Sequence, residues 1–500
     1  MLVTACGARL SPEQQAYYDR ANLGAGTTQD QVPVAVQSVA GGGAPSVPSV
    51  AVGTSSGTGP TAVSAPAQVV QTGGPQSSAG PAASTPLTQQ HGSTAPSRGP
   101  SVAPAATDPG SVSINPEICK APAAGPGISA TEIDVGNVST LTGPIPGIFL
   151  GAVHGAQAFA TYLNSIGGIC GRKVVIKSAD DNLQVSQNAS ATQSLAGQVF
   201  AFVGSFSADD QGGAAVLKST GTPDIGQALS QERFSLPNNF APEPIAGWNA
   251  APYVTMKQLH PDAALHMAIL GANQPVAQHE YTVEKAALES VGYKFVYTDP
   301  NIEPTQTDYS ADAQAMKSAG AQGVALSSTA ALCAALARAI QNAGIEIFPL
   351  GTYSTTAYDE AFIAQAGTAA EGALLYFAEA MYQGEDSQAV PMVATFNRWY
   401  RGLYNRAPDE YALYAWMSGL LWLDGLNKGG ALNQQALMAG LKQMTSFDAN
   451  GLVATNNPAQ KKPPTCYLLI DIKGGKFVRD PSDPPTGFNC KNAPNYYYSS

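Results

Sequence analysis

The sequence predicts an α/β protein with two lobes of parallel sheet, preceded by a long disordered linker. Residues 23–107 are almost wholly Gly, Pro, Ser, Thr, Ala, Val and Gln, and such a segment buries too little apolar surface to fold. From residue 128 onward, short apolar strands alternate with helices, which is typical of a parallel sheet covered on both faces. The alternation restarts near Trp248, so we expect two lobes and not one oversized sheet.

The N-terminal segment, residues 1–22, contains VTAC at residues 3–6, which matches the cleavage pattern of bacterial lipoprotein precursors. Cleavage there would leave Cys6 to carry lipid. A secretory signal needs a positively charged start and an apolar run of about 7–15 residues, and this chain has neither before Cys6. Either the true start codon lies upstream or the match is accidental. We expect lipidation of Cys6, since the rest of the chain indicates export.

Composition excludes several classes of function. The formal net charge is −11, and Lys and Arg are scattered, whereas nucleic-acid binding needs a clustered basic footprint. The globular part has no run of 18 apolar residues, so we expect no membrane-spanning helix in it. No cysteine pair has C-x-x-C spacing, and the histidines form no ligand cluster with the cysteines. We therefore expect neither a metal nor a cofactor.

The first series of elements begins with a strand at 132–141 and a helix at 148–168. Phe149, Phe159 and Leu163 share one face of this helix, and the pair Gly167-Gly168 is a typical helix end. The series continues with a strand at 172–182, a helix at 185–198, a strand at 199–205 and a helix at 210–221.

The second series has the same alternation. It comprises strands at 263–273, 294–300, 323–328 and 347–353, with helices at 279–292, 310–320 and 331–344. Ligands of such sheets lie beyond the carboxyl ends of the strands. The loops there are rich in hydroxyls, amides and glycine and poor in paired acid–base groups. This composition favours a binding protein and not an enzyme.

Six cysteines indicate disulfides and export. Cys466 and Cys490 flank a hairpin-like stretch, and Cys119 and Cys170 stand at the domain entrance and at the first helix–strand turn. We expect these two pairs, although spacing alone does not fix connectivity, and disulfides imply an oxidising compartment outside the cytoplasm. Cys333 lies in an Ala/Leu-rich helix and is expected to be a buried free thiol.

A turn and strand at residues 164–182, NSIGGICGRKVVIKSADDN, resemble the leucine/isoleucine/valine-binding protein family. These are the type I periplasmic solute-binding proteins of ABC importers. The matching positions are Asn164, Gly167, Gly168, Gly171, Arg172, Lys173, Asp180 and Asp181. Further matches follow in the expected order: LTGPIPG at 141–147, FVGSFSADD at 202–210 and AGTAAEGALLYFAEA at 366–380.

The resemblance implies two Rossmann-like lobes joined by a three-crossover hinge, closing on a small ligand. Lobe 1 would comprise 116–247 and 379–455, and lobe 2 would comprise 248–378 and 456–490. The linker would span 23–115, and 491–500 would form a C-terminal tail.

The family's ligand contacts can be carried over to this chain. They fall on Ile148, Ser205, Ser207, Ala208, Gln227, Ala228, Leu229, Gln274, Thr329 and Tyr353. Ser205 and Ser207 are explained equally well as turn or cap residues. Tyr411 and Tyr414 are expected in a helix-pair core, with contact to the cleft as the alternative.

One departure from the family bears on the ligand. Amino-acid-binding members have an acidic residue where this chain has Tyr353, and a buried ammonium without a counter-charge is costly. The ligand therefore stays open among an amino acid, an amide and an aromatic compound.

The function implied is that of a monomeric, extracytoplasmic substrate-binding protein, held to the cell membrane only by lipid on Cys6. It would capture a small organic solute by lobe closure and deliver it to ABC permease subunits. The alternative is a sensory module of the same fold that docks to a signalling partner. A secreted hydrolase is disfavoured, because the globular part has no nucleophile–base motif.

Overall fold

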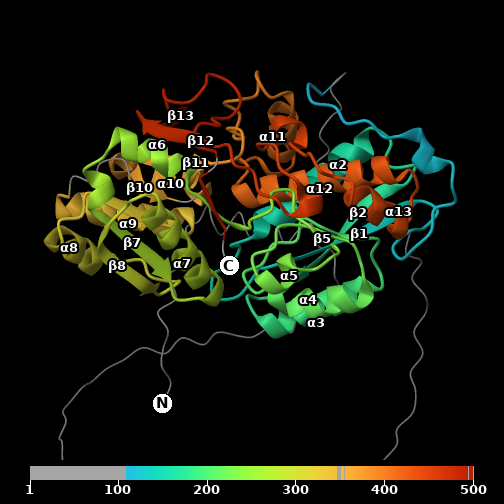
Figure 1. Ribbon diagram of the computed structural model, residues 1–500. Helices are drawn as coiled ribbons and strands as arrows, with labels where there is room; N and C mark the ends of the chain where they lie inside the picture. The colour runs from blue at the N-terminus through green and yellow to red at the C-terminus, as the bar shows by residue number, and fades with distance from the viewer. Residues whose placement is uncertain (1–107, 346–350, 354, 494, 499–500) are drawn as a thin grey trace, which may run out of the picture. The chain divides into compact units, whose positions relative to one another are not determined.

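The computed structural model describes residues 108–345, 351–353, 355–493 and 495–498, without the side chains of 351–355. Within these residues the chain forms two α/β lobes (Figure 1). The expectations for residues 1–22, including Cys6, and for residues 23–107 of the linker lie outside the described residues. No helix in the described part is long and apolar enough to cross a bilayer.

Lobe 1 contains a five-stranded parallel sheet of order β2-β1-β3-β4-β5. Its strands are β1 (Glu132–Ser139), β2 (Lys173–Asp180), β3 (Phe202–Val203), β4 (Asp224–Ile225) and β5 (Asn239–Phe240). At the end of β2, Asp180 accepts from the amides of Leu141 (2.8 Å) and Thr142 (3.2 Å). This carboxylate thereby fixes the loop that follows β1.

Helices cover both faces of this sheet (Figure 1). They are α2 (Leu150–Ser165), α3 (Val185–Ala196), α4 (Gln211–Thr220), α5 (Gln231–Phe234), α11 (Pro391–Tyr404), α12 (Glu410–Gly429) and α13 (Gln434–Leu441). Helix α12 begins where Asp409 accepts from the Ala412 amide (2.9 Å) and ends at Gly430, whose φ is 70°. It packs along α2, where the buried ring of Trp416 stacks on Tyr162 of α2 with 5.5 Å between ring centroids.

Lobe 2 contains a four-stranded parallel sheet of order β10-β9-β7-β8. Its strands are β7 (Met267–Ala272), β8 (Phe295–Ile302), β9 (Gly323–Leu326) and β10 (Gly351–Tyr353). Its helices are α6 (Ala251–Leu259), α7 (Pro275–Ser290), α8 (Ser310–Ser318), α9 (Ala330–Ala343) and α10 (Glu360–Ala366). Helix α7 begins four residues earlier than predicted, because Pro275 occupies the first helical position, where its missing N–H costs nothing.

Two small antiparallel sheets complete the described part. One pairs β11 (Leu374–Phe377) with β12 (Leu468–Lys473), and β12 with β13 (Lys476–Arg479). The other pairs β6 (Gly247–Asn249) with β14 (Tyr496–Tyr498). Residues 491–500 were predicted to form a C-terminal tail. Within them, β14 pairs with β6, on the first connection from lobe 1 to lobe 2.

The chain passes between the lobes three times: after β5, after β11 and before β12. Short 3₁₀ helices lie in the connections, at Pro116–Cys119, Ala263–Leu265, Thr355–Ala357, Gly367–Ala370, Ala449–Gly451 and Pro458–Gln460. The third passage is tied to the first, because the Asn456 side chain donates to the carbonyl of Pro242 (2.9 Å). The expected three-crossover arrangement of two parallel-sheet lobes is therefore present.

Residues 108–115 were expected to end the linker, but they have defined contacts with lobe 1. The carboxylate of Asp108 pairs with Arg398, and the Gly110 amide donates to Thr395 Oγ1 (2.9 Å). The Val112 amide donates to the Tyr162 hydroxyl (3.0 Å). Ordered structure therefore begins before residue 116, because the backbone groups of this segment find partners on α2 and α11.

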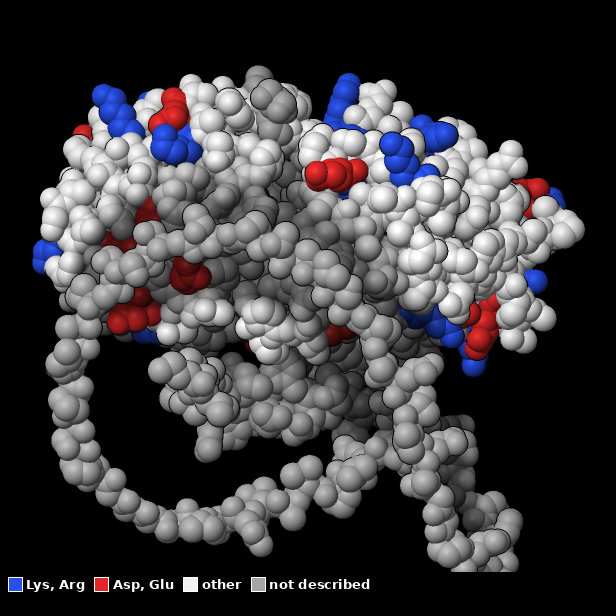
Figure 2. Space-filling model, turned by 90° about the horizontal axis from the view of Figure 1, so that it is seen from below, with Lys and Arg blue, Asp and Glu red and all other residues white. Residues whose placement is uncertain are grey.

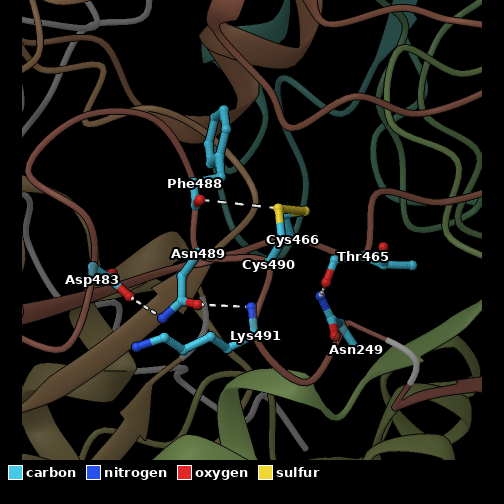
Figure 3. Close-up of a disulfide and its surroundings, with 8 residues drawn as sticks. All are labelled: Asn249, Thr465, Cys466, Asp483, Phe488, Asn489, Cys490 and Lys491. Carbon is cyan, nitrogen blue, oxygen red and sulfur yellow. Dashed lines mark hydrogen bonds between the residues drawn. A yellow bond between two sulfur atoms is a disulfide. The ribbon is translucent and has the colours of Figure 1, made fainter.

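Two disulfides join the pairs that the sequence suggested, Cys119–Cys170 and Cys466–Cys490, and Cys333 is free and buried. Figure 3 shows the second disulfide together with Asn489, which donates to Asp483 (2.8 Å) and accepts from the Lys491 amide (2.9 Å). The chain that leads to β14 is thus fixed at its start.

Candidate ligand-binding site

A cavity of about 310 Å³ is lined by residues of both lobes and of the passages between them. Lobe 1 contributes Ile145, Ile148, Phe149, Phe206, Ala208, residues 227–231, Phe234, Glu410, Tyr411 and Tyr414. Lobe 2 contributes Ala272, Gln274, Val276, Ala277, His279, Glu280, Val283, Pro304, residues 327–329, Leu332 and Thr356. The remaining wall consists of residues 243–245, 247–249 and 376–378, Pro463, Pro464 and Tyr496.

Aromatic rings form the lobe 1 wall. Phe149 lies 4.8 Å from Phe206 and 4.8 Å from Tyr411 between ring centroids, and Phe206 stacks on Tyr414 at 5.9 Å. Tyr411 and Tyr414 come from the first turns of α12, next to its Asp409 cap. Both tyrosines line the cavity. The structure therefore has the alternative given from the sequence, in which they reach the cleft.

The loop after β4 is positioned by a buried carboxylate. Asp210 accepts from the amides of Leu229 (2.8 Å) and Ser230 (3.0 Å). Arg233 lies 3.7 Å from this carboxylate and pairs with Asp224 at 2.7 Å. Because all three charged groups are buried and paired, residues 227–230 are fixed against the cavity.

Helix N-termini of lobe 2 face the same cavity. Gln274 precedes α7, and Thr329 caps α9 by accepting from the Leu332 amide (3.4 Å). One turn into α7, Glu280 lines the wall, and burial raises its pKa from 4.5 to about 7. Its neighbour Glu284 accepts from the Tyr253 hydroxyl (2.7 Å), and burial raises its pKa to about 8.

Three carboxyl groups gather where the passages between the lobes meet α12. Glu243 follows β5, Glu379 follows β11, and Glu410 begins α12. Burial and the neighbouring carboxyls of Glu379 and Glu410 raise the pKa of Glu243 well above its ordinary value. Burial also raises the pKa of Glu379. The site therefore has carboxyl groups although position 353 is a tyrosine.

Seven of the residues carried over from the family line this one cavity. They are Ile148, Ala208, Gln227, Ala228, Leu229, Gln274 and Thr329. They come from loops that follow different strands and from both lobes, so the tertiary fold brings them together. Their contact with a ligand stays a prediction.

Two other expected contacts are placed differently, and the third, Tyr353, stays a prediction. The hydroxyl of Ser205 accepts from the Val138 amide (3.0 Å) and that of Ser207 from the Asp209 amide (3.0 Å). Both serines are buried behind the wall and do not line the cavity, because short hydroxyls at strand ends readily satisfy nearby backbone donors. The backbone of Tyr353 belongs to β10, and its side chain lies outside the described part.

Several wall residues were not expected from the sequence. Glu243 and Trp248 belong to the first passage, Tyr376 lies within β11, and Tyr496 belongs to β14. Residues of a passage between lobes have no periodicity that marks a site. Asp180 and Asp181, two of the positions that match the family, are engaged with lobe 1 partners.

The arrangement is suited to holding a small organic molecule. Hydrophobic and aromatic walls with a few polar groups are typical of small-molecule sites. In the ranges that the structure describes, no group of three or more His, Cys, Asp or Glu side chains could hold a metal ion.

Two α/β lobes around one shared cavity define the class of two-lobed solute-binding proteins. A family model described as periplasmic binding protein matches residues 132–476. The chain belongs to this family, and its resemblance to the Leu/Ile/Val-binding, type I members is confirmed. Proteins of the family are extracytoplasmic, bind small-molecule solutes and work with ABC transporters.

Individual relatives agree with this assignment. The chain is similar to Leu/Ile/Val-binding protein homolog 3 of Brucella melitensis, with 27% identity over 257 residues, 49% of this chain and 66% of that protein. The match thus spans just under two thirds of the relative's length.

Solved structures share the fold. The fatty acid ABC transporter substrate-binding protein from Thermomonospora curvata has a TM-score of 0.63 and 19% identity, covering 75% of this chain and 97% of that one. The branched-chain amino acid transporter substrate-binding protein LivJ from Streptococcus pneumoniae, in complex with isoleucine, has a TM-score of 0.55 and 18% identity, covering 70% and 100%. Identities this low describe the fold and not the ligand.

Proposed function

We propose that the protein is the substrate-binding protein of an ABC importer and captures a small organic solute by closing its lobes. The observation that carries this proposal is the cavity of about 310 Å³, whose wall is drawn from both lobes and from the passages between them. A ligand that touches both walls favours the closed arrangement, since it binds that arrangement more tightly than the open one.

The chemistry of the wall supports binding without conversion of the solute. The hydroxyls of Ser205 and Ser207 are engaged with backbone amides, and that of Thr329 caps α9. His154 is buried beneath the Tyr404 ring, 3.9 Å between centroids, and burial lowers its pKa to about 3. We therefore propose that the protein is not an enzyme.

Location and anchoring belong to the same proposal. Two disulfides are consistent with an oxidising compartment, and we propose an extracytoplasmic protein held at the membrane by lipid on Cys6. Relatives are named for branched-chain amino acids and for a fatty acid, so both classes belong among the first solutes to test.

The test is a thermal-shift panel on the full chain, with amino acids, amides, amines, aromatic acids, fatty acids and nucleosides. We expect at least one class to raise the melting temperature, and X-ray scattering with that compound to show a smaller radius of gyration. A panel without any shift, or conversion of the bound compound to product, would contradict the proposal.

Anchoring is tested separately in cells. The wild type should partition with membranes and the Cys6→Ser variant should be released, while a Cys333→Ser variant should behave as the wild type. Equal release of Cys6→Ser and wild type would contradict the lipid anchor.

A further inference from the structure

We infer that the ligand of the cavity carries a net positive charge. The geometry points to a small organic amine with an apolar or aromatic body, whose ammonium group lies against Glu243. This inference rests on the proposed function, because it names the class of solute that the same site would take.

The charged side chains of the wall are acidic. Glu243, Glu280 and Glu410 line the cavity, whereas its described lining contains no Lys or Arg and, as a histidine, only the exposed His279. Lys461 lies outside this lining, over the Phe234 ring (5.0 Å), and donates to the Asn239 carbonyl (2.9 Å). On the face seen in Figure 2, acidic and basic side chains are scattered among uncharged residues. The excess of acidic over basic side chains is thus a feature of the cavity and not of this face.

The carboxyls of Glu243 and Glu379 lie together on two neighbouring passages between the lobes. In the described part, the carboxyl oxygens Glu243 Oε2 and Glu379 Oε1 and Oε2 are buried, and the polar groups beside Glu379 are the Glu243 carboxyl, the Tyr414 hydroxyl and backbone amides. Two adjacent carboxyls in such surroundings cannot both ionise cheaply, and burial with the Glu379 charge raises the pKa of Glu243. An ammonium group would supply the positive charge that the described cavity lining lacks beside these carboxyls.

Gln227 gives an independent indication of a hydrogen-bond donor in the ligand. Its side chain is 2% exposed, and its Nε2 donates to the main-chain carbonyl of Glu243 (2.8 Å). That bond fixes the amide orientation, because the opposite flip would place two oxygens in contact. Gln227 lines the cavity, and its Oε1 is buried without a hydrogen-bond partner in the described part. A buried acceptor without a donor is unfavourable, so a ligand N–H is favoured there.

The aromatic wall suits the body of such a ligand and its charge. Phe206, Tyr411 and Tyr414 form one contiguous ring cluster beside Glu410. A cation over an aromatic face is attracted by the negative face of the ring quadrupole. The rings therefore support an organic cation.

An amino acid is the competing class, because the loop amides of Ala208 and Ala228 stand at the same wall and could hold a carboxylate. A zwitterion would add a carboxylate to a wall that already holds the carboxyls of Glu243, Glu280 and Glu410, whereas an amine would add only a positive charge. The net charge of the ligand therefore distinguishes the two classes.

The experiment compares ligands with one skeleton and three charges, by calorimetry on the full chain. The aliphatic set is 3-methylbutylamine, leucine and 4-methylpentanoate, and the aromatic set is phenethylamine, phenylalanine and 3-phenylpropanoate. In at least one set we expect the amine to bind about tenfold or more tightly than the zwitterion, and the carboxylate not to bind. Magnesium and calcium chloride alone serve as controls for metal ions.

Two variants test the residues. Glu243→Gln removes the charge at nearly constant shape, and we expect the amine to bind about 10- to 100-fold more weakly. Glu280→Gln is a second variant, on lobe 2, and it should also lower the affinity for the amine. It keeps the test available if Glu243→Gln fails to fold. The control is Glu232→Gln on α5, an exposed carboxyl outside the wall, which should leave affinity unchanged.

The outcomes separate the two proposals. Tighter binding of leucine, phenylalanine or either carboxylate, an unchanged affinity in both wall variants, or saturable binding of the metal salts would overturn the cationic ligand while leaving the solute-binding function. If no compound of any charge binds, neither here nor in the wider panel, the proposed function fails and this inference fails with it.

Discussion

Individual carboxyl groups have two different roles in this chain. Asp181 accepts from Thr140 Oγ1 (2.7 Å) and Asn188 Nδ2 (2.8 Å), and Asp224 forms a bidentate pair with Arg233 (2.7 and 2.9 Å). Each of these groups is buried with its partners. Glu243 and Glu280 instead lie on the cavity and have their pKa raised by burial. The first kind holds lobe 1 together, and the second kind is available to a ligand.

Replacing Arg233 by Met tests the first role. The change leaves Asp224 and Asp210 buried without their positive partner, so we expect the free energy of unfolding to fall by about 3–5 kcal/mol. Urea unfolding measures this loss. Lys120→Met breaks the exposed Lys120–Glu117 pair and should change stability by less than about 0.5 kcal/mol. Equal effects of the two variants would contradict the prediction.

The pH dependence of stability tests the second role. The pKa of Glu280 is raised from 4.5 to about 7 in the folded chain, so the folded state binds this proton more tightly than the unfolded state. Its contribution is full at low pH and is lost as the pH rises through about 7. Glu280→Gln should therefore reduce the fall in ligand-free stability between about pH 5 and about pH 8.

Urea unfolding across this pH range provides the measurement. Glu289→Gln alters an exposed carboxyl on the same helix, paired with Lys285. It should leave the slope of unfolding free energy against pH as in the wild type. A slope that Glu280→Gln does not change would show that the Glu280 carboxyl is well solvated in the folded chain.

At the scale of elements, the wall depends on how closely α2 and α12 approach. A Cβ built on Gly155 of α2 would lie 2.1 Å from the Ala412 carbonyl oxygen, and one on Gly419 of α12 would lie 2.3 Å from the Phe159 ring. Glycine at both positions thus allows the close crossing. The same crossing places Tyr411 and Tyr414 at the cavity.

Gly155→Ala should separate the two helices. We expect a loss of about 1–3 kcal/mol from overpacking, although alanine is the better helix former. Gly197→Ala is the matched control, since a Cβ there meets nothing within 4 Å and the residue has an ordinary helical φ of −86°. Thermal melting compares the two variants, and equal melting temperatures would contradict the close crossing.

For the whole molecule, the disulfides have different positions relative to the site. Cys119–Cys170 links the entrance of lobe 1 to the turn after α2, far along the chain from any wall residue of lobe 2. Cys466–Cys490 holds the segment that leads to β14, which pairs with β6 and brings Tyr496 to the cavity. Loss of the Cys466–Cys490 bond should therefore lower the affinity for the ligand, and loss of the Cys119–Cys170 bond should not.

The paired variants Cys119→Ser/Cys170→Ser and Cys466→Ser/Cys490→Ser test this difference. Their bonds span 51 and 24 residues, so chain entropy predicts losses of about 4 and about 3.5 kcal/mol. Only the second pair of substitutions should also weaken binding of the ligand found in the panel. An affinity that it leaves intact would show that β14 holds its position without the disulfide.

Local chemistry explains the prediction of the alternating strands and helices and of the restart at the second lobe. The positions of the cysteines suggested both disulfides, and the resemblance to the family suggested the loops that carry Gln227, Gln274 and Thr329. Apolar periodicity and capping act between residues a few positions apart, so they are legible in a single sequence. The tertiary structure decided which side chains face the cavity. Ser205 and Ser207 turn to nearby amides, while Glu243 and Tyr496 reach the wall from a passage and a C-terminal strand. These contacts join distant segments of the chain, and their register is fixed only when the lobes have packed.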